Sequence, residues 1–139
     1  MILVDSTVWI DLIAGSGGTC CAALHALISD NQDICLTDIN VMEITRGIRD
    51  DLMFDKVRSS LLRFPILTVG GLDSYVEATR LYRKARRGGV TINSTYDCLI
   101  AQIALENGAS ILSDDQDFAR LAKFEPALRI ADPEAILTL

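Results

Sequence analysis

The amino-acid sequence predicts an α/β fold in three layers, with a central parallel sheet of four to five strands flanked by helices. Short apolar runs typical of buried strands alternate along the chain with segments of helical periodicity. Strands and helices that alternate in this way form a parallel sheet covered on both faces. The chain has 139 residues, and half of them are hydrophobic, which suits one domain with a sizeable core. We therefore expect a single domain over residues 1–139.

Five runs have the composition of strands. The first, Ile2-Leu3-Val4, is apolar throughout and ends at an acidic residue. The third follows Pro65 and is closed by two glycines, which commonly interrupt regular structure. The last run, residues 128–130, gives the weakest indication of a strand, because it consists of only two apolar residues, one on either side of an arginine. The expected strands cover residues 2–4, 34–37, 66–69, 110–112 and 128–130.

Eight segments show helical spacing or helix-end signals. The glycines at 15, 17 and 18 stop the first helix, Asp38 is the expected N-cap of the third, and Pro65 ends the fourth. The segment 94–106 is apolar on nearly every side, which predicts a buried helix. The expected helices cover residues 8–13, 19–29, 38–48, 50–64, 73–87, 94–106, 117–123 and 133–137.

Composition excludes several classes of protein. The chain carries 13 Lys and Arg against 19 Asp and Glu, a net charge of −6, which argues against a general polyanion binder unless a bound metal reverses the local sign. Four cysteines without a C-x-x-C pair and a single histidine argue against a zinc site and favour reduced, packed thiols. The N-terminus lacks a basic segment, and no apolar run reaches membrane-spanning length. We expect a cytoplasmic protein without a membrane partner.

Acidic residues follow three of the predicted strands. Ligands of open parallel sheets bind beyond the carboxyl ends of the strands, so these side chains are expected to converge there. A further acid, Asp97, lies in the first turn of the predicted buried helix. The acids that follow strands are Asp5, Asp38 with Glu43 a turn later, and Asp114, Asp115 and Asp117.

Each acid also has a purely structural alternative. The alternatives are an N-cap at Asp5, a pair of Glu43 with Arg46, a capping box of Ser94 with Asp97, and an N-cap at Asp115 or Asp117. Together the acids are harder to explain in this way. Carboxylates about 5 Å apart repel by about 3 kcal/mol at an effective dielectric near 20, so a converging set needs protons or a cation. Oxygen ligands without His or Cys favour Mg²⁺ or Mn²⁺, and such ions support phosphodiester cleavage.

Four blocks of sequence resemble a known family. They are residues 2–11, residues 43–47, residues 97–101 leading to 104–109, and residues 113–118. In order, spacing and strand context, the chain resembles a PIN-domain ribonuclease of the VapC toxin type, nearly end to end. The resemblance implies hydrolysis of RNA by in-line attack of water, leaving a 5′-phosphate and a 3′-hydroxyl. It also implies inhibition by a small cognate antitoxin and a homodimeric toxin.

The resemblance assigns roles to individual residues. The implied catalytic acids are Asp5, Glu43, Asp97 and Asp115, and the implied ligands of Mg²⁺ or Mn²⁺ are Asp5, Asp97, Asp115 and Asp117. The hydroxyls of Thr7 and Ser113 match positions that orient the site from behind the metal ligands. Asp114 and Asp115 are adjacent, and the S-x-D-x-D-F register favours Asp115 as the ligand, with Asp114 as an exposed neighbour.

Five cations gather near the end of the predicted helix at 73–87. They are Arg80, Arg83, Lys84, Arg86 and Arg87. They either complement the helix dipole or hold RNA phosphates beside the acids, and the last four are the candidates for RNA binding. Trp9 is expected in the core, although the first helices of the resembled family help to form the antitoxin groove.

Two other functions are weighed against the nuclease. A phosphatase-like enzyme with an aspartyl nucleophile would suit Asp5, but it needs a second Asp where Thr7 stands and a Lys between Lys84 and Lys123. A catalytically silent PIN fold that only binds a partner is the second alternative. All the matched acids are present, which gives no support for lost catalysis.

Overall fold

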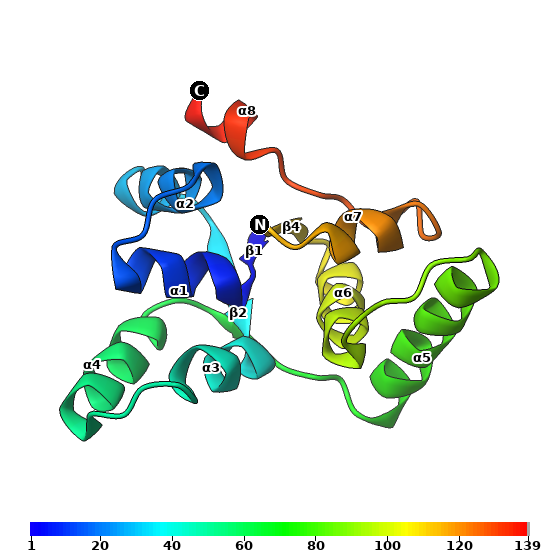
Figure 1. Cartoon of the computed structure of the whole chain (residues 1–139), viewed down its shortest axis with the longest axis horizontal. Helices are drawn as coiled ribbons and strands as arrows, with labels where there is room; N and C mark the ends of the chain where they lie inside the picture. Colours follow the sequence, from blue (N-terminus) through cyan, green and yellow to red (C-terminus); the bar gives the residue numbers. More distant parts are fainter. Residues whose placement is uncertain (139) are drawn as a thin grey trace.

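The computed structural model describes residues 1–138. Within this range four strands and eight helices alternate along the chain (Figure 1). The strands are β1 (Ile2–Val4), β2 (Ile34–Thr37), β3 (Ile66–Leu67) and β4 (Ser110–Leu112). The helices are α1 (Ser6–Ala14), α2 (Thr19–Ser29), α3 (Asp38–Thr45), α4 (Asp51–Leu61), α5 (Leu72–Arg87), α6 (Thr95–Asn107), α7 (Gln116–Ala122) and α8 (Pro133–Leu137).

The four strands form one parallel sheet in the order β3-β2-β1-β4. Ile2 is aligned with Ile34 on one side and with Ser110 on the other. The predicted α/β class and parallel sheet are therefore confirmed. The fifth predicted strand is reduced to a single bridge between Ile130 and Ile111. Because all strands run the same way, the residues that follow β1, β2 and β4 meet at one edge.

Two hydrophobic clusters cover the two faces of the sheet. Successive strand residues point to opposite faces, so Leu3 joins one cluster and Val4 the other. Helices α5, α6 and α7 pack on the Leu3 side, while α1, α2 and α4 pack on the Val4 side (Figure 1). Residues Cys98–Ala101 of α6 are all buried, as the apolar composition of this helix predicts. The C-terminal helix α8 packs against α2.

Several predicted boundaries are wrong by a few residues. The N-cap of α3 is Thr37 rather than Asp38, because Thr37 forms a reciprocal capping box with Asn40. Helix α3 ends at Thr45 instead of residue 48, before a glycine that disfavours helix. Helix α4 ends at Leu61 instead of residue 64, since the position before a proline avoids helical angles. Strand β3 keeps only two of its four predicted residues.

The thiols are packed as predicted. All four cysteines are free, and Cys20, Cys35 and Cys98 are buried. Burial raises the pKa of both Cys35 and Cys98 to about 11, so these thiols stay protonated at neutral pH. Within residues 1–138 no single helix is both long and apolar enough to cross a membrane; α1 and α2 pass that test only as a pair, bent by 84°.

Candidate active site

Asp5 stands where β1 turns into α1. It is the N-cap residue by backbone position, but its carboxylate makes no capping hydrogen bond. Instead the carboxylate accepts a hydrogen bond from Ser113 Oγ at 2.9 Å and a longer one from Asn40 Nδ2 at 3.4 Å. The residue is only 5% exposed. The capping alternative for the Asp5 side chain is therefore wrong, and donors from two other segments hold this carboxylate at the sheet edge.

The two hydroxyls predicted to orient the site differ in the strength of their contacts. Ser113 follows β4, donates to Asp5 Oδ2, and accepts from the backbone N–H of Asp115 at 2.9 Å. Thr7 is exposed, and its Oγ1 lies 3.5 Å from Asp5 Oδ2, at the limit of a hydrogen bond. Ser113 is therefore the stronger anchor of Asp5.

Glu43 reaches the same edge from α3. Its Oε1 accepts a hydrogen bond from Ser6 Oγ at 2.7 Å, and Ser6 Oγ accepts one from Asn40 Nδ2 at 2.8 Å. Among residues 1–138, no ion pair forms between Glu43 and Arg46, so the predicted structural alternative for Glu43 is not seen. The glutamate is instead oriented by the residue that follows Asp5.

Asn40 links these acids to the start of α3, and sequence reasoning missed it. It is fully buried, and its Oδ1 accepts hydrogen bonds from the backbone N–H of Thr37 at 2.9 Å and from Thr37 Oγ1 at 2.8 Å. Its Nδ2 donates hydrogen bonds to Ser6 Oγ and Asp5 Oδ1. One amide thus caps a helix and orients two acids. Its position three residues before Glu43, on the same face of the helix, is the signal that could have revealed it.

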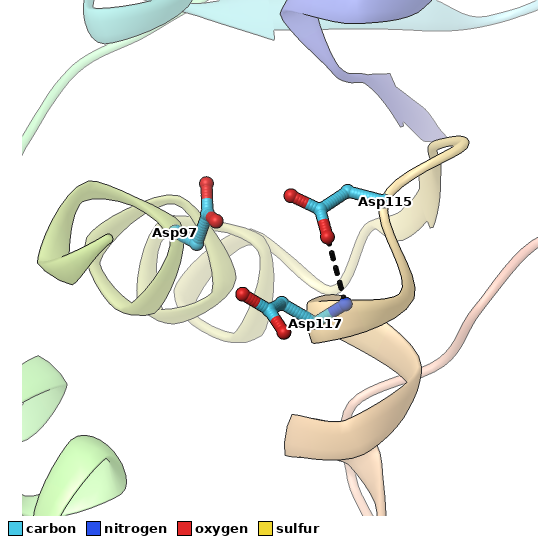
Figure 2. Close-up of side chains that lie close together, drawn as sticks. All are labelled: Asp97, Asp115 and Asp117. Carbon is cyan, nitrogen blue, oxygen red and sulfur yellow. Dashed lines mark hydrogen bonds between the residues drawn. The ribbon is translucent and has the colours of Figure 1, made fainter. Parts of the chain in front are cut away.

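Asp97, Asp115 and Asp117 converge from α6 and the start of α7 (Figure 2). One carboxylate oxygen of each lies within 4.8 Å of those of the other two. Ser94 caps α6 through the backbone N–H of Tyr96, and no capping box with Asp97 forms. The Asp97 carboxylate, on a residue 9% exposed, accepts no hydrogen bond within the described chain.

The residues at the start of α7 have distinct roles. Asp115 is the N-cap and accepts a hydrogen bond from the backbone N–H of Asp117 at 2.9 Å, so its capping alternative is confirmed alongside its place in the cluster. Asp114 is exposed, as predicted. Asp117 is fully buried and accepts hydrogen bonds from Arg120 Nη1 at 2.7 Å and from the backbone N–H of Asn93 at 3.1 Å.

The electrostatics of the site follow from burial and like charge. Burial, and then the neighbouring carboxylates led by Asp115 and Asp5, raise the pKa of Asp97 to about 7. Burial also raises the pKa of Asp5, although the nearby Ser6 backbone and the hydrogen bond from Ser113 act against it. The acids therefore resist simultaneous ionisation, and a cation among them would relieve the repulsion.

The donor set suits a hard divalent cation. Every side-chain ligand atom in the cluster is a carboxylate oxygen, and the chain's single histidine, His25, is exposed on α2. Oxygen ligands without imidazole or thiolate match Mg²⁺ or Mn²⁺ rather than zinc. These residues therefore fit the cofactor that the sequence predicts.

The cations near the end of α5 stand apart from this cluster. Arg80 pairs with Glu77 at 3.3 Å on the same helix. The other four are exposed and form no ion pair within residues 1–138. The segment 88–94 joins their end of α5 to α6 and bonds to Asp117 through Asn93. The charges at this end of α5 are therefore free to contact a ligand.

Comparison with known proteins agrees with this geometry. Residues 2–124 match the PIN domain, a range that contains all four sequence blocks. The chain belongs to the PIN-domain family. This PIN domain is 32% identical over 124 residues to VapC ribonuclease Mb1587 of Mycobacterium bovis and to Ribonuclease VapC11 of Mycobacterium tuberculosis, covering 88% of this chain and 92% of each relative.

Solved structures share the fold of this PIN domain. VapBC2 from Rickettsia felis, bound to a DNA fragment from its promoter, superposes with a TM-score of 0.73 at 19% identity, covering 94% of this chain and 98% of the other. FitAcB from Neisseria gonorrhoeae superposes with a TM-score of 0.76 at 20% identity, covering 96% and 99%. The resemblance inferred from the sequence blocks is therefore confirmed at the level of family and fold.

Proposed function

We propose that this PIN domain is a metal-dependent endoribonuclease that acts as the toxin of a toxin–antitoxin pair. The observation that carries the proposal is the convergence of the Asp97, Asp115 and Asp117 carboxylates within 4.8 Å of one another, where Asp97 has no hydrogen-bond donor of its own within the described chain. Such a group needs a proton or a cation. The curated relatives named VapC ribonuclease support the nuclease over the phosphatase-like alternative.

The residues that the sequence assigns to Mg²⁺ or Mn²⁺ are Asp5, Asp97, Asp115 and Asp117. When bound, such an ion would activate water and stabilise charge on the leaving oxygen of a phosphodiester. Ser113 and Asn40 orient Asp5 from both sides. Ser6 occupies Oε1 of Glu43, which leaves Oε2 of that residue to accept a proton from the attacking water. In-line attack at an RNA phosphate would leave a 5′-phosphate and a 3′-hydroxyl.

RNA phosphates are proposed to contact the exposed cations at the end of α5. These residues, Arg83, Lys84, Arg86 and Arg87, lie on the last turns of one helix. Phosphate contacts position a nucleic acid without reading its bases. Without the five acids of the site, 14 acids remain against 13 Lys and Arg. The rest of the molecule is therefore nearly neutral, which lowers the electrostatic barrier to RNA.

We propose that the antitoxin docks in the apolar groove between α1, α2 and α4. The groove has a volume of about 330 Å³, and Trp9, Ile13, Ile28, Met53 and Phe64 are among its lining residues. Ile13, Ile28 and Met53 are exposed, although large apolar side chains are usually covered. A toxin–antitoxin complex from Klebsiella pneumoniae also contains this fold, with a TM-score of 0.70 at 17% identity over 96% of this chain and 98% of the other, which supports an apolar segment of an antitoxin as the occupant.

The nuclease itself is tested by metal dependence. Cleavage of RNA is expected with Mg²⁺ or Mn²⁺ and none with EDTA, and Asp5→Asn is expected to lower the rate by about 10³-fold or more. The readout is a 5′-phosphate on the product, with Asp114→Asn as the matched exposed control. If cleavage persists in EDTA or in Asp5→Asn, the proposed function is wrong. A protein that binds its partner but never cleaves RNA would instead be the silent PIN fold.

The docking groove is tested on α4. Met53→Glu places a charge in the groove and is expected to weaken binding of the cognate antitoxin by about 10–30-fold, the scale of an interface hot spot. Leu62→Glu is the control, since Leu62 is similarly exposed at the end of the same helix but does not line the groove. Calorimetric titration of the purified proteins measures both. Equal weakening by the two variants would place the antitoxin elsewhere.

A further inference from the structure

Asp117 differs from the other acids of the cluster in how completely its carboxylate is occupied. It is 0% exposed, Oδ1 accepts a hydrogen bond from Arg120 Nη1 at 2.7 Å, and Oδ2 accepts one from the backbone N–H of Asn93 at 3.1 Å. Asp97, by contrast, accepts none within the described chain. Two neighbouring carboxylates thus have opposite states, one already paired and one without a partner.

The charge of Asp117 is already balanced by a cation. A buried carboxylate needs a charged partner and further hydrogen bonds to offset the loss of hydration. Arg120, one turn later on α7, supplies the charge, and its side chain extends to solvent with 48% exposure. A divalent ion at the same oxygens would lie against this guanidinium and be repelled by it.

The second hydrogen bond of Asp117 ties α7 to the start of α6. Asn93 immediately precedes Ser94, the N-cap of α6, and Asp97 lies in the first turn of that helix. The same side chain therefore fixes where α6 begins relative to α7. This sets the approach of Asp97 to Asp115, which caps α7.

We propose that Asp117 is a positioning residue, clamped between Arg120 and the Asn93 amide, and that the metal centre rests on Asp5, Asp97 and Asp115 instead. This inference rests on the proposed function for the existence of the metal centre. The role of Asp117 thereby changes from a metal ligand to a residue that holds α6 and α7 in place relative to each other. Arg120 then acts as a resident cation on the side of the cluster where a second metal ion would bind.

Titration of the purified protein with Mn²⁺ separates the two roles. Arg120→Gln exposes the charge of Asp117 and is expected to tighten Mn²⁺ binding about tenfold, or to add a second site. The double variant Asp117→Asn/Arg120→Gln removes one charge of each sign and is expected to bind Mn²⁺ within about threefold of wild type. Asp97→Asn is expected to weaken binding at least about tenfold, as loss of a ligand does.

Control variants exclude indirect effects. Arg120→Lys keeps the charge and is expected to bind Mn²⁺ as the wild type does, which is the rescue that a merely structural arginine would not show. Asp114→Asn removes an exposed neighbouring carboxylate and is expected to change the affinity little. Weakening of about tenfold or more in the double variant, or unchanged affinity in Arg120→Gln, would overturn the proposal.

Hydrogen exchange tests the clamp without metal. The Asn93 amide is expected to exchange slowly in wild type and at least about tenfold faster in Asp117→Ala, whereas Asp117→Asn keeps a carbonyl acceptor and retains most of the protection. If Asn93 exchanges equally fast in wild type and Asp117→Ala, the clamp does not exist. If the wild type binds no Mn²⁺ but its Asn93 amide is protected, the proposed function is refuted, whereas the structural role of Asp117 still holds.

Discussion

Asp97→Asn is expected to abolish RNA cleavage, by at least about 10³-fold, and to make the metal-free protein more stable at pH 8. The first effect follows from loss of a carboxylate that faces Asp115 and Asp117 within 4.8 Å. The second follows because an amide of the same shape carries no charge. This single substitution thus separates the contribution of Asp97 to the rate of RNA cleavage from its effect on the free energy of unfolding.

The pH dependence of stability has a definite sign. The pKa of Asp97 is raised from 3.8 to about 7 in the folded protein, chiefly by burial and then by the neighbouring carboxylates. Unfolded chains therefore ionise this acid at lower pH than folded ones, so the free energy of unfolding falls as pH rises from about 4 to about 7 and is level above. The shift of about three pKa units sets an upper bound of roughly 4 kcal/mol, and solvent screening at the partly accessible carboxylate makes the expected fall smaller than this bound. Asp97→Asn should lack this decline.

Urea unfolding in EDTA at pH 5 and pH 8 measures the effect. The free energy of unfolding of the wild type should be lower at pH 8 than at pH 5. This difference between the two pH values should be smaller in Asp97→Asn. Asp114→Asn, at an exposed position, should show the same difference as the wild type. Adding Mn²⁺ at pH 8 should restore stability to wild type far more than to Asp97→Asn. A variant as unstable at pH 8 as wild type would show that Asp97 is not under electrostatic strain.

Asn40→Ala is expected to lower the free energy of unfolding by about 3 kcal/mol and to reduce RNA cleavage by about 10²-fold or more. The fully buried amide accepts two hydrogen bonds from Thr37 and donates to Ser6 and Asp5. Alanine leaves these buried groups unpaired and removes the half of the α3 capping box in which Asn40 accepts from the backbone N–H of Thr37. Thermal or urea unfolding gives the first quantity, and single-turnover cleavage gives the second.

Asn40→Asp separates the contribution of Asn40 to the cap of α3 from its contribution to orienting the acids. The carboxylate can still accept from Thr37, so the cap of α3 survives, but it cannot donate to Ser6 and adds a negative charge where Nδ2 lies 3.4 Å from Asp5. Cleavage should fall as in the alanine variant, with a smaller loss of stability at pH 5 than at pH 8. Asn107→Ala, at an exposed asparagine, should change stability by less than about 1 kcal/mol. Equal activity of Asn40→Asp and wild type would mean that Asn40 only caps the helix.

The fold class and the acids could be predicted because both depend on local pattern. Apolar runs marked β1, β2 and β4, and parallel strands necessarily bring the residues after them to one edge. Asp5 and Asp115 were therefore accessible from the sequence, and Asp97 was accessible from its place in the first turn of the apolar helix α6. The fifth strand was not, because whether a short run such as 128–130 pairs fully depends on neighbours far along the chain.

Ser113 was predicted to orient the site, whereas Asn40 and Ser6 could not be, because their contacts with the acids depend on how separate segments fold together. Thr37 and Asp38 are both good N-caps by type, and the choice between them depends on Asn40, whose amide is also held by Ser6 from another element. The spacing of Asp117 and Arg120 suggests a pair, but nothing in the sequence says that Asp117 is fully buried. Burial converts an ordinary surface pair into a structural one.

Trp9 connects two functional regions and makes the molecule its own optical probe. It is the only tryptophan in the chain, its Nε1 donates a hydrogen bond to the carbonyl of Val4 at 3.0 Å, and its ring lies in the groove with a centroid 5.1 Å from that of Phe64. The next residue after Val4 is Asp5. Intrinsic fluorescence therefore originates from one side chain that contacts both the groove and the backbone leading to the acids, so a ligand at either place can be followed without a label.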